Sequence, residues 1–334
     1  MSGFFGRIRN FCSPIFLLIS SLCMVFSVFA EVSLESVFRS DVAFEESFHP
    51  LPLRVMVFGS SFVDIALEVS EDFLVRSGLR IGDPSIADIA TIRKIVMEYE
   101  SEYDRPVPSK RREPVSNLKK QLSRLGILCV DHLEKRGPME NEAAKVQLSL
   151  YSPSGKRASC YSVTGIEDLV KKGIDSSKFG YNEHTLVDGH LLFYDDYVEK
   201  VLRISKDREN RVILDMSDQL AVRELRLRFW RLLPQVDVIF LSGESAGIFT
   251  GMGSPLEACK FLSKFRKLVV IKDDNSKIFF ISDPSNPGVC QRHFASQEKA
   301  EMFRTGFMFG YLNGARSEYC VSCAESLSSE ESLA

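Results

Sequence analysis

The sequence predicts an α/β fold in which a mostly parallel sheet is flanked by helices. Short apolar segments, typical of buried strands, alternate along the chain with longer segments whose apolar residues recur every three or four positions, as in helices. Strands that alternate with helices form βαβ units, which build parallel sheets. The composition, 45% hydrophobic and 26% charged, is that of a globular protein, and 334 residues suffice for one large domain or two small ones.

The individual elements follow from local patterns. Residues 54–58 form a short, mainly apolar run (Arg-Val-Met-Val-Phe) that ends at Gly59, as a buried strand would. Asp83-Pro84 is expected to open a helix, because proline suits a first helical turn. The charged, proline-bearing residues 101–114 predict a loop. The other expected elements are a helix at 116–125, a hairpin within 145–162 turning at 152–155, a strand ending at 186–189, a helix at 194–206, a strand at 211–216, a helix at 223–233, a strand at 236–241, a helix at 255–265 and a strand at 268–271.

Residues 295–315 predict a long helix near the end of the chain. Ser296 is a suitable N-cap and Gly314 a suitable C-terminal stop. Gly306 and Gly310 lie one turn apart, which predicts a close approach to a second backbone. The expected apolar face consists of Ala300, Phe303, Phe307, Tyr311 and Leu312.

The N-terminus predicts export or membrane attachment. Arg7 and Arg9 precede an almost unbroken apolar run, which ends at Val28-Phe29-Ala30 in a pattern that signal peptidase recognises. Residues 1–30 are therefore interpreted as a signal peptide or, since the run is close to spanning length, as a membrane anchor. Both interpretations put the body outside the cytoplasm. A misassigned start, with the protein beginning near Met56, would leave it cytoplasmic. Residues 31–52 are expected to be a linker.

Charge and cysteine content limit the remaining classes. A net charge of −3 argues against a nucleic-acid partner. The polar, acidic residues 325–334 predict a disordered tail. The six cysteines beyond residue 30 could pair in fifteen ways in an exported protein. Cys320 and Cys323 form a lone CxxC, which is weak evidence for zinc and favours buried helix cysteines.

Several segments carry a family resemblance in their order and spacing. They are VMVFGSSFVDIALEVSEDFLVRSGLRIG, YSPSGKR, RVILDMSD, VDVIFLSGESAGIFTG and GFMFGYLNGARSEYCVSCA. From about Leu53 to Ala324 the chain resembles the adenosine-kinase-like branch of the PfkB (ribokinase) family of carbohydrate kinases. The resemblance implies a ribokinase-like three-layer fold over residues 53–324, with a small β lid that includes segments near 67–81 and 145–162.

The resemblance implies a sugar or nucleoside site at Asp64 and Asn117. Asp64 stands at the position of the family's aspartate after the first strand, although Ser60 replaces the asparagine that follows the strand-end glycine. Asn117 stands at the asparagine of a Gly-Gly-x-x-x-Asn motif whose glycines are missing here. A carboxylate and an amide are side chains that can hydrogen-bond a diol.

The nucleotide side departs from the family. In the family, an Asn-x-x-Glu motif helps organise magnesium. In this chain the corresponding residues are 242–245, where Glu244 stands one position out of register. The nucleotide-side glycines are absent from residues 272–277. The glycine-rich phosphate cradle ending in the catalytic aspartate is replaced by residues 296–301, with Glu301 at the aspartate position. Glu298 would add a repulsion of roughly 4 kcal/mol toward a phosphate charge about 4 Å away.

Three functional hypotheses follow. The first is an exported or membrane-tethered pseudoenzyme with weak or no ATP-dependent phosphotransfer, which binds a sugar, a nucleoside or a protein partner. The second is an active sugar or nucleoside kinase that uses Mg and ATP, with Glu301 as the base and Glu244 as a metal ligand. The third, a disulfide-bearing structural protein, rests only on the cysteines. Glu301 also has a purely structural interpretation, as a first-turn acid that favours the helix dipole.

Overall fold

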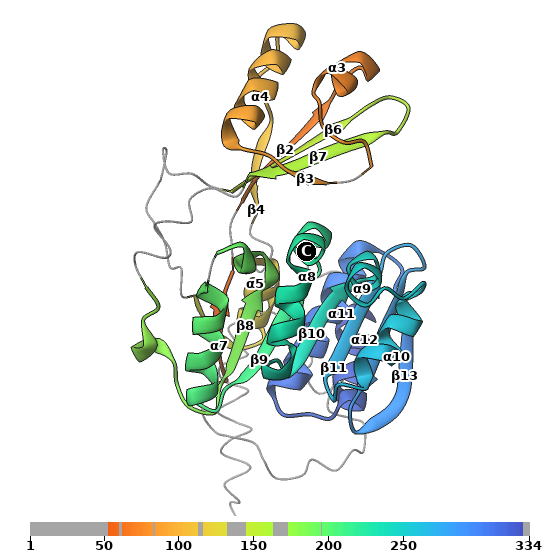
Figure 1. The fold of residues 1–334 in the computed structure, drawn as a ribbon. Coiled ribbons are helices and arrows are strands. Elements are labelled where there is room, and N and C mark those ends of the chain that lie inside the picture. Colours follow the sequence, from red (N-terminus) through yellow and green to blue (C-terminus); the bar gives the residue numbers. More distant parts are fainter. Residues whose placement is uncertain are drawn as a thin grey trace, which may run out of the picture. The chain divides into compact units, whose positions relative to one another are not determined.

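The computed structural model describes residues 53–59, 62–82, 84–112, 116–131, 145–162, 173–194 and 196–329 (Figure 1). These residues form an eight-stranded sheet flanked by helices and a second, five-stranded sheet. The predicted signal or anchor at 1–30 and the predicted linker at 31–52 lie outside the described residues. In the described part, no helix is long and apolar enough to cross a bilayer.

The large sheet is mostly parallel, as predicted. Its order is β13-β12-β11-β10-β9-β8-β1-β5, and the six strands from β11 to β5 run parallel. The antiparallel strands β12 and β13 extend one edge and were not predicted. The strands are β1 (Arg54–Phe58), β5 (Leu128–Asp131), β8 (His184–Asp188), β9 (Arg211–Met216), β10 (Val238–Ser242), β11 (Leu268–Asp273), β12 (Ile278–Asp283) and β13 (Asn286–His293).

Helices cover both faces of this sheet, which gives the three layers that the sequence predicts (Figure 1). Along β1, Met56 and Phe58 join the core on one face, and Val55 and Val57 the core on the other, because strand side chains alternate. The first face carries α7 (Tyr197–Asp207), α8 (Gln219–Leu232), α9 (Gly243–Thr250) and α10 (Pro255–Ser263). The second carries α5 (Ser116–Arg124), α11 (Gln297–Leu312) and α12 (Ser317–Ser329).

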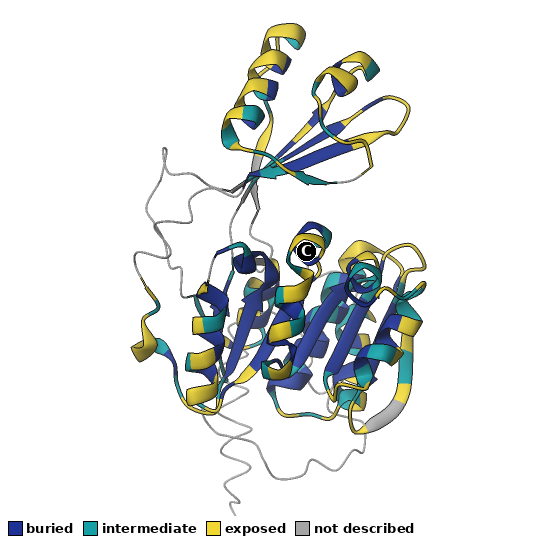
Figure 2. Ribbon diagram, viewed as in Figure 1, coloured by how far each residue is buried: buried dark blue, intermediate teal, exposed yellow. Residues whose placement is uncertain are grey.

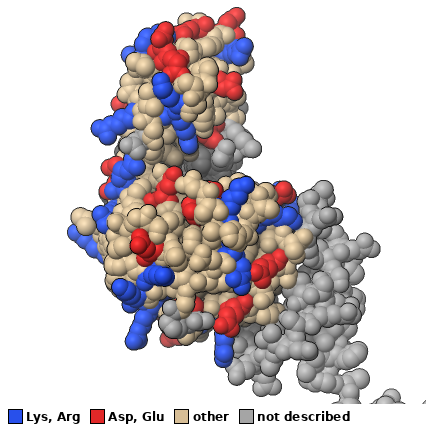
Figure 3. All heavy atoms as spheres, turned by 90° about the vertical axis from the view of Figure 1, so that its right-hand side faces the viewer, with Lys and Arg blue, Asp and Glu red and all other residues tan. Residues whose placement is uncertain are grey.

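Burial follows the same layering. The central strands are buried along their length, whereas the helices present exposed residues on their outer sides (Figure 2). On the face shown in Figure 3, basic and acidic side chains are interspersed, and no broad basic surface is visible. That distribution agrees with the net charge of −3.

The smaller sheet is the predicted β lid, with order β3-β7-β6-β2-β4. The predicted hairpin is present, since β6 and β7 pair antiparallel and Gly155 takes φ 80° in the turn. Two helices pack on this sheet through Phe73 and Tyr99. The elements are β2 (Phe62–Glu68), α3 (Glu71–Arg76), β3 (Ser85–Ile86), α4 (Ile89–Tyr103), β4 (Ser109–Arg112), β6 (Lys145–Tyr151) and β7 (Arg157–Ser162).

Two predictions within the lid are wrong. The helix expected from Asp83 begins at Ile89, because Asp88 caps it by accepting a hydrogen bond from the Thr91 amide at 2.6 Å. The loop expected at 101–114 contains the end of α4 and the strand β4. Tyr103 stacks on Tyr99 at 4.7 Å, so aromatic packing extends the helix past its charged sequence.

Three further predictions, which concern the large sheet and its helices, also differ from the structure. Asp218 caps α8 through the Ala221 amide at 2.7 Å, so that helix begins before the predicted residue 223. Helix α9 falls in a segment that was not predicted to be helical. The prediction of a disordered tail from residue 325 is wrong for residues 325–329, which belong to α12. Residues 330–334 lie outside the described part.

Helices α11 and α12 approach closely at two glycines, as the sequence predicts. A Cβ atom on Gly306 would lie 2.6 Å from the Cys323 carbonyl oxygen, and one on Gly310 would lie 2.8 Å from Cys320 Cα. A Cβ atom closer than 3.0 Å to a backbone atom of the other helix would force one of the two helices to move. The glycines therefore set the spacing between the two helices.

The cysteines do not support a disulfide-bearing protein. All six cysteines in the described residues are free, including the buried Cys320 and Cys323 of α12. Burial raises the pKa of the Cys320 thiol, which keeps it protonated. The prediction of buried helix cysteines is confirmed, whereas the disulfide hypothesis is wrong for these six. Cys12 and Cys23 lie outside the described residues.

Alanine at Gly306 or Gly310 should destabilise the protein by about 1–3 kcal/mol, because the added methyl overpacks the contact between α11 and α12. Gly247→Ala in α9 is a matched control, since its Cβ would have 3.6 Å to the Met252 carbonyl oxygen. The control should be neutral or stabilising by up to about 1 kcal/mol. Urea unfolding measures the free energy of unfolding of all three variants. An equal change in the control and in the α11 variants would show that α11 and α12 are not in close contact.

Candidate functional site

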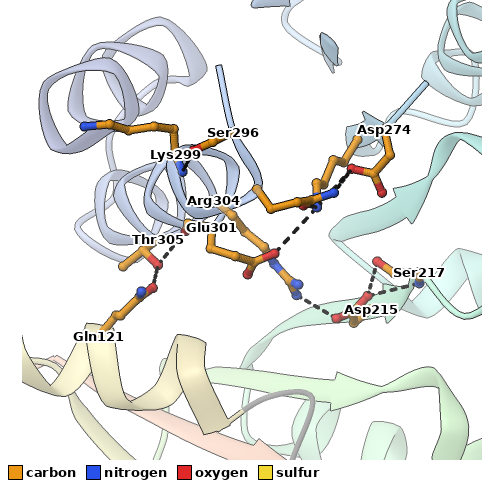
Figure 4. Close-up of polar contacts among 11 residues, drawn as sticks. Gln121, Asp215, Ser217, Asp274, Ser296, Lys299, Glu301, Arg304 and Thr305 are labelled. Atoms are coloured by element: carbon orange, nitrogen blue, oxygen red, sulfur yellow. Dashed lines mark hydrogen bonds and ion pairs between the residues drawn. The ribbon is translucent and has the colours of Figure 1, made fainter. Parts of the chain in front are cut away.

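The candidate site lies at the carboxyl ends of the parallel strands. In open α/β sheets, ligands bind in the crevice outside this edge. Here β8 ends in Asp188, and Asp215 of β9 lies beside it in the strand register. The first turns of α11 add further polar side chains (Figure 4). We call these residues the carboxyl-edge cluster: Asp188, Asp215, Ser217, Lys272, Asp274, Gln297, Glu301 and Arg304.

A buried ion pair lies at the centre of this cluster. Arg304 of α11 donates from Nη2 to Oδ2 of Asp215 at 2.6 Å, and the two side chains are only 14% and 10% exposed. The amide and hydroxyl of Ser217 donate to the other carboxylate oxygen at 3.0 and 2.6 Å. The guanidinium also lies 5.0 Å from the centre of the Phe240 ring. Asp215 is thus held from two sides (Figure 4).

Both partners of the pair are charged. Burial alone would raise the pKa of Asp215, but Arg304 and the Ser217 hydrogen bonds outweigh burial, so the pKa lies below its usual value. Burial alone would lower the pKa of Arg304, but Asp215 and then Glu301 outweigh it and raise the pKa. The Arg304 Nε is buried and has no hydrogen-bond partner among the described residues. The hydrogen bond from Nη2 to Asp215 is therefore central to satisfying this buried guanidinium.

Lys272 connects the end of β11 to the first turns of α11. Its Nζ donates to Oε1 of Gln297 at 2.5 Å and lies 3.2 Å from Asp274 and 3.6 Å from Glu301. Gln297 in turn donates to Asp274 at 2.8 Å. Gln297 and Glu301 of α11 thus contact Lys272 at the end of β11, and Gln297 also contacts Asp274 in the turn after it.

The start of α11 is capped by a side chain of the same segment. Ser296 is the predicted N-cap, and its hydroxyl oxygen accepts a hydrogen bond from the Lys299 amide at 3.2 Å. Glu298 is exposed in the first turn. Glu301, the predicted base, has a half-exposed side chain and lies in the second turn against Lys272. No glycine occurs from Gln291 to Thr305 to bring an anion close to the backbone.

The segment aligned with the magnesium motif forms a helix cap. Ser242 accepts from the Ser245 amide at 3.1 Å, and both hydroxyls donate to the Ser217 carbonyl oxygen at 2.9 Å. Glu244 is exposed in the first turn of α9. Among the described residues there is no group of three His, Cys, Asp or Glu that could hold a metal ion. Metal binding by Glu244 stays a prediction.

The predicted sugar residues come from different parts of the fold. Asp64 is partly buried in β2 of the lid, where it pairs in register with Lys110 and Gln147. Asn117 is exposed in the first turn of α5, which packs on the large sheet. Their shared role in ligand binding stays a prediction.

Sequence reasoning missed the residues that dominate the cluster. Arg304 lies one turn after Ala300 and one turn before Phe307, on the face predicted to be apolar, so it could have been recognised as a buried charge that needs a partner. The partner Asp215 lies 89 residues away. A second missed contact joins His190, which follows β8 in the short helix η2 (Gly189–Phe193), to Asp218 at 3.2 Å.

Comparisons with known proteins identify the fold. No family model matches the chain, and a search of curated proteins finds no match. Adenosine kinase from Sinorhizobium meliloti is 16% identical with a TM-score of 0.62, covering 83% of this chain and 93% of that one. Adenosine kinase from Anopheles gambiae, in complex with a di(adenosine) tetraphosphate, is 14% identical with a TM-score of 0.61, covering 83% and 94%. A probable sugar kinase from Rhizobium etli is 15% identical with a TM-score of 0.63, covering 83% and 92%.

At sequence identities of 14–16%, the similarity to these solved structures establishes the fold alone. The chain has the ribokinase-like fold of adenosine kinases and PfkB sugar kinases, as the resemblance of its segments predicts.

Arg304→Met should destabilise the protein by about 3–5 kcal/mol, because it leaves Asp215 buried without its cation. The double variant Arg304→Met/Asp215→Asn should recover more than half of this loss, since the amide removes the charge and still accepts from Ser217. Urea unfolding at neutral pH measures both. A loss below about 1 kcal/mol in the single variant would show that solvent compensates the carboxylate.

The same pair predicts a dependence on pH. Because the folded pKa of Asp215 lies below its unfolded value of about 3.9, its ionised form stabilises the fold above that pH, and the contribution is lost as pH falls through the folded pKa. The stability difference between the wild type and Asp215→Asn should therefore shrink below about pH 4. A constant difference from pH 7 to pH 3 would contradict the lowered pKa.

Proposed function

We propose that the protein is a pseudoenzyme on the kinase fold, which binds a ligand and transfers phosphate from ATP weakly or not at all. The observation that carries this proposal is the network at the start of α11, where Lys272, Asp274, Gln297 and Glu301 bind one another.

A phosphate site at a helix start needs open amides and room for the anion. In this chain Ser296 already accepts from one first-turn amide, and the residues after it carry side chains in place of glycine. The exposed carboxylate of Glu298 adds negative charge to the same turn. These features oppose the approach of a triphosphate.

The position of Glu301 also argues against strong catalysis. A general base must come within hydrogen-bond distance of the proton that it removes. The Glu301 carboxylate lies 3.6 Å from the Lys272 ammonium. It also carries one methylene more than aspartate, and a misplacement of about 1 Å can cost about 10²-fold in rate.

The proposed ligand is a sugar or nucleoside bound through Asp64 and Asn117. A carboxylate and an amide together offer the acceptors and donors that a pair of hydroxyls requires. Solved adenosine kinases from Schistosoma mansoni contain adenosine or 2-fluoroadenosine, which supports testing nucleosides first. A protein partner is the other class of ligand that the hypothesis includes.

An active kinase with Mg and ATP is the second candidate function. It is favoured by one observation: Glu301 keeps a carboxylate at the family's aspartate position, and that side chain is 40% exposed. In this reading Glu301 removes the proton from a substrate hydroxyl, and Glu244 contributes to binding the metal.

The proposed location is outside the cytoplasm or at a membrane. Support comes from Arg7 and Arg9 followed by the apolar run, which together have the pattern of a signal peptide or anchor. An intact Met1 on a soluble cytosolic protein would favour the active kinase instead, because ATP is abundant there.

Mg-ATP should bind more weakly than about 1 mM, which corresponds to about 4 kcal/mol or less, and phosphoryl transfer to a panel of sugars and nucleosides should be negligible. Calorimetry and a radiolabelled transfer assay measure the two quantities. Micromolar affinity, or turnover that disappears in Glu301→Gln, would establish the active kinase.

Asp64→Ala should abolish the thermal shift produced by whichever sugar or nucleoside stabilises the wild type, because it removes the acceptors for the hydroxyl groups. Glu68→Ala is the matched control, since Glu68 is exposed and lies on the same strand and the same side of it. The control should keep the full shift. Equal thermal shifts in both variants would show that Asp64 does not bind the ligand.

A further inference from the structure

The first helix layer carries a surface patch with no role in the carboxyl-edge cluster. It lies on α8, α10 and the turn after α10, and the two helices cover the same face of the large sheet (Figure 1). Leu227 is 74% exposed and Phe265 is 42% exposed, whereas most large apolar side chains of this layer are buried. We call this surface the aromatic–basic patch: Leu227, Trp230, Arg231, Phe261, Lys264, Phe265 and Arg266.

Ring contacts make the patch continuous across the two helices. Trp230 of α8 lies 5.4 Å from Phe265 and 6.1 Å from Phe261, and the two phenylalanines lie 5.6 Å apart. The inner face of Trp230 stacks on Phe249 at 4.3 Å, which fixes the indole against the core. Leu227 lies one turn before Trp230 and extends the apolar surface along α8.

The same two helices and the turn after α10 carry exposed cations. Exposed acids on the two helices are confined to Glu224 and Glu257 among the described residues, and the exposed cations outnumber them. Lys264 lies 6.0 Å from the centre of the Phe261 ring, so charge and aromatic surface are directly adjacent. The exposed cations of α8, α10 and the turn after α10 are Arg223, Arg226, Arg231, Lys260, Lys264 and Arg266.

Helix stability explains only part of this arrangement. Arg231 and Lys260 lie in last helical turns, where a cation favours the helix dipole. The dipole gives no reason for exposing Leu227 and Phe265 beside these cations. The combination of exposed Leu and Phe, a tryptophan with partial exposure and exposed Lys and Arg on the same helices is the chemistry of surfaces that lie in a membrane interface.

We propose that the aromatic–basic patch docks on an anionic lipid surface. Leu227 and Phe265 enter the interfacial region of the bilayer, Trp230 lies at the level of the headgroups, and Arg231, Lys264 and Arg266 contact lipid phosphates and carboxylates. Anionic lipid is the occupant because it offers both the negative charge and the apolar layer that the patch requires. A nucleic acid would leave Leu227 and Phe265 without a comparable apolar layer.

Trp230 is the only tryptophan in the chain, so its fluorescence reports on the patch alone. The full chain is mixed with vesicles of phosphatidylcholine, with or without phosphatidylserine, and each set is repeated with brominated acyl chains. We expect a shift to shorter wavelength and quenching by bromine with phosphatidylserine vesicles only, both lost at high salt. Vesicle attachment through residues 1–30 would not by itself bring bromine to Trp230.

Matched variants test the charge and apolar parts separately. Arg231→Glu/Lys264→Glu should lose the quenching, and Leu227→Ser should reduce it, with Tm unchanged because these side chains are exposed. The control Lys94→Glu removes a cation that is 77% exposed on α4 of the lid and should leave the quenching intact. The proposal is overturned if phosphatidylserine vesicles do not change Trp230 emission, if neutral vesicles quench equally, or if the charge variant behaves as the wild type.

Discussion

The ion pair between Arg304 and Asp215 joins α11 to the centre of the large sheet, and the carboxyl-edge cluster is arranged around it. Both groups are buried, and the largest contribution that keeps each of them charged is the opposite charge of the other, 2.6 Å away. Arg304 thereby fixes how α11 lies over β9, and Gly306 and Gly310 on the same helix fix the distance to α12. Glu301, one turn before Arg304, is held beside Lys272 by the same placement.

This arrangement explains how the start of α11 can be stable without a bound phosphate. A cradle for a triphosphate needs backbone amides that await an anion, and such amides contribute nothing to stability until the ligand binds. At the start of α11, Gln297 binds Lys272 and Asp274, and Ser296 accepts from the Lys299 amide, so these groups have partners without a ligand. The helix is retained because its other face is buried against the sheet and α12.

The aromatic–basic patch and the carboxyl-edge cluster lie toward opposite ends of the strands. Helix α8 begins just after β9 ends and returns to the start of β10, so Trp230 and Arg231 near its end lie toward the amino edge of the sheet. Lys267, after α10, donates to the carbonyl oxygen of Pro234 at 3.1 Å, which joins the two helix ends there. A membrane contact at this edge would leave the carboxyl edge accessible to a ligand.

The sequence by itself determined the fold class, the parallel strands, the lid hairpin and the close approach at Gly306 and Gly310, because periodicity, turn residues and glycine spacing are local signals. It did not determine β12 and β13, or the extension of α4 to Tyr103, because those depend on pairing and packing with distant residues. The partners of Arg304 and Lys272 were likewise decided by the tertiary structure. A charge in a sequence shows that a partner is needed once it is buried, but only the folded chain selects which distant carboxylate comes within reach.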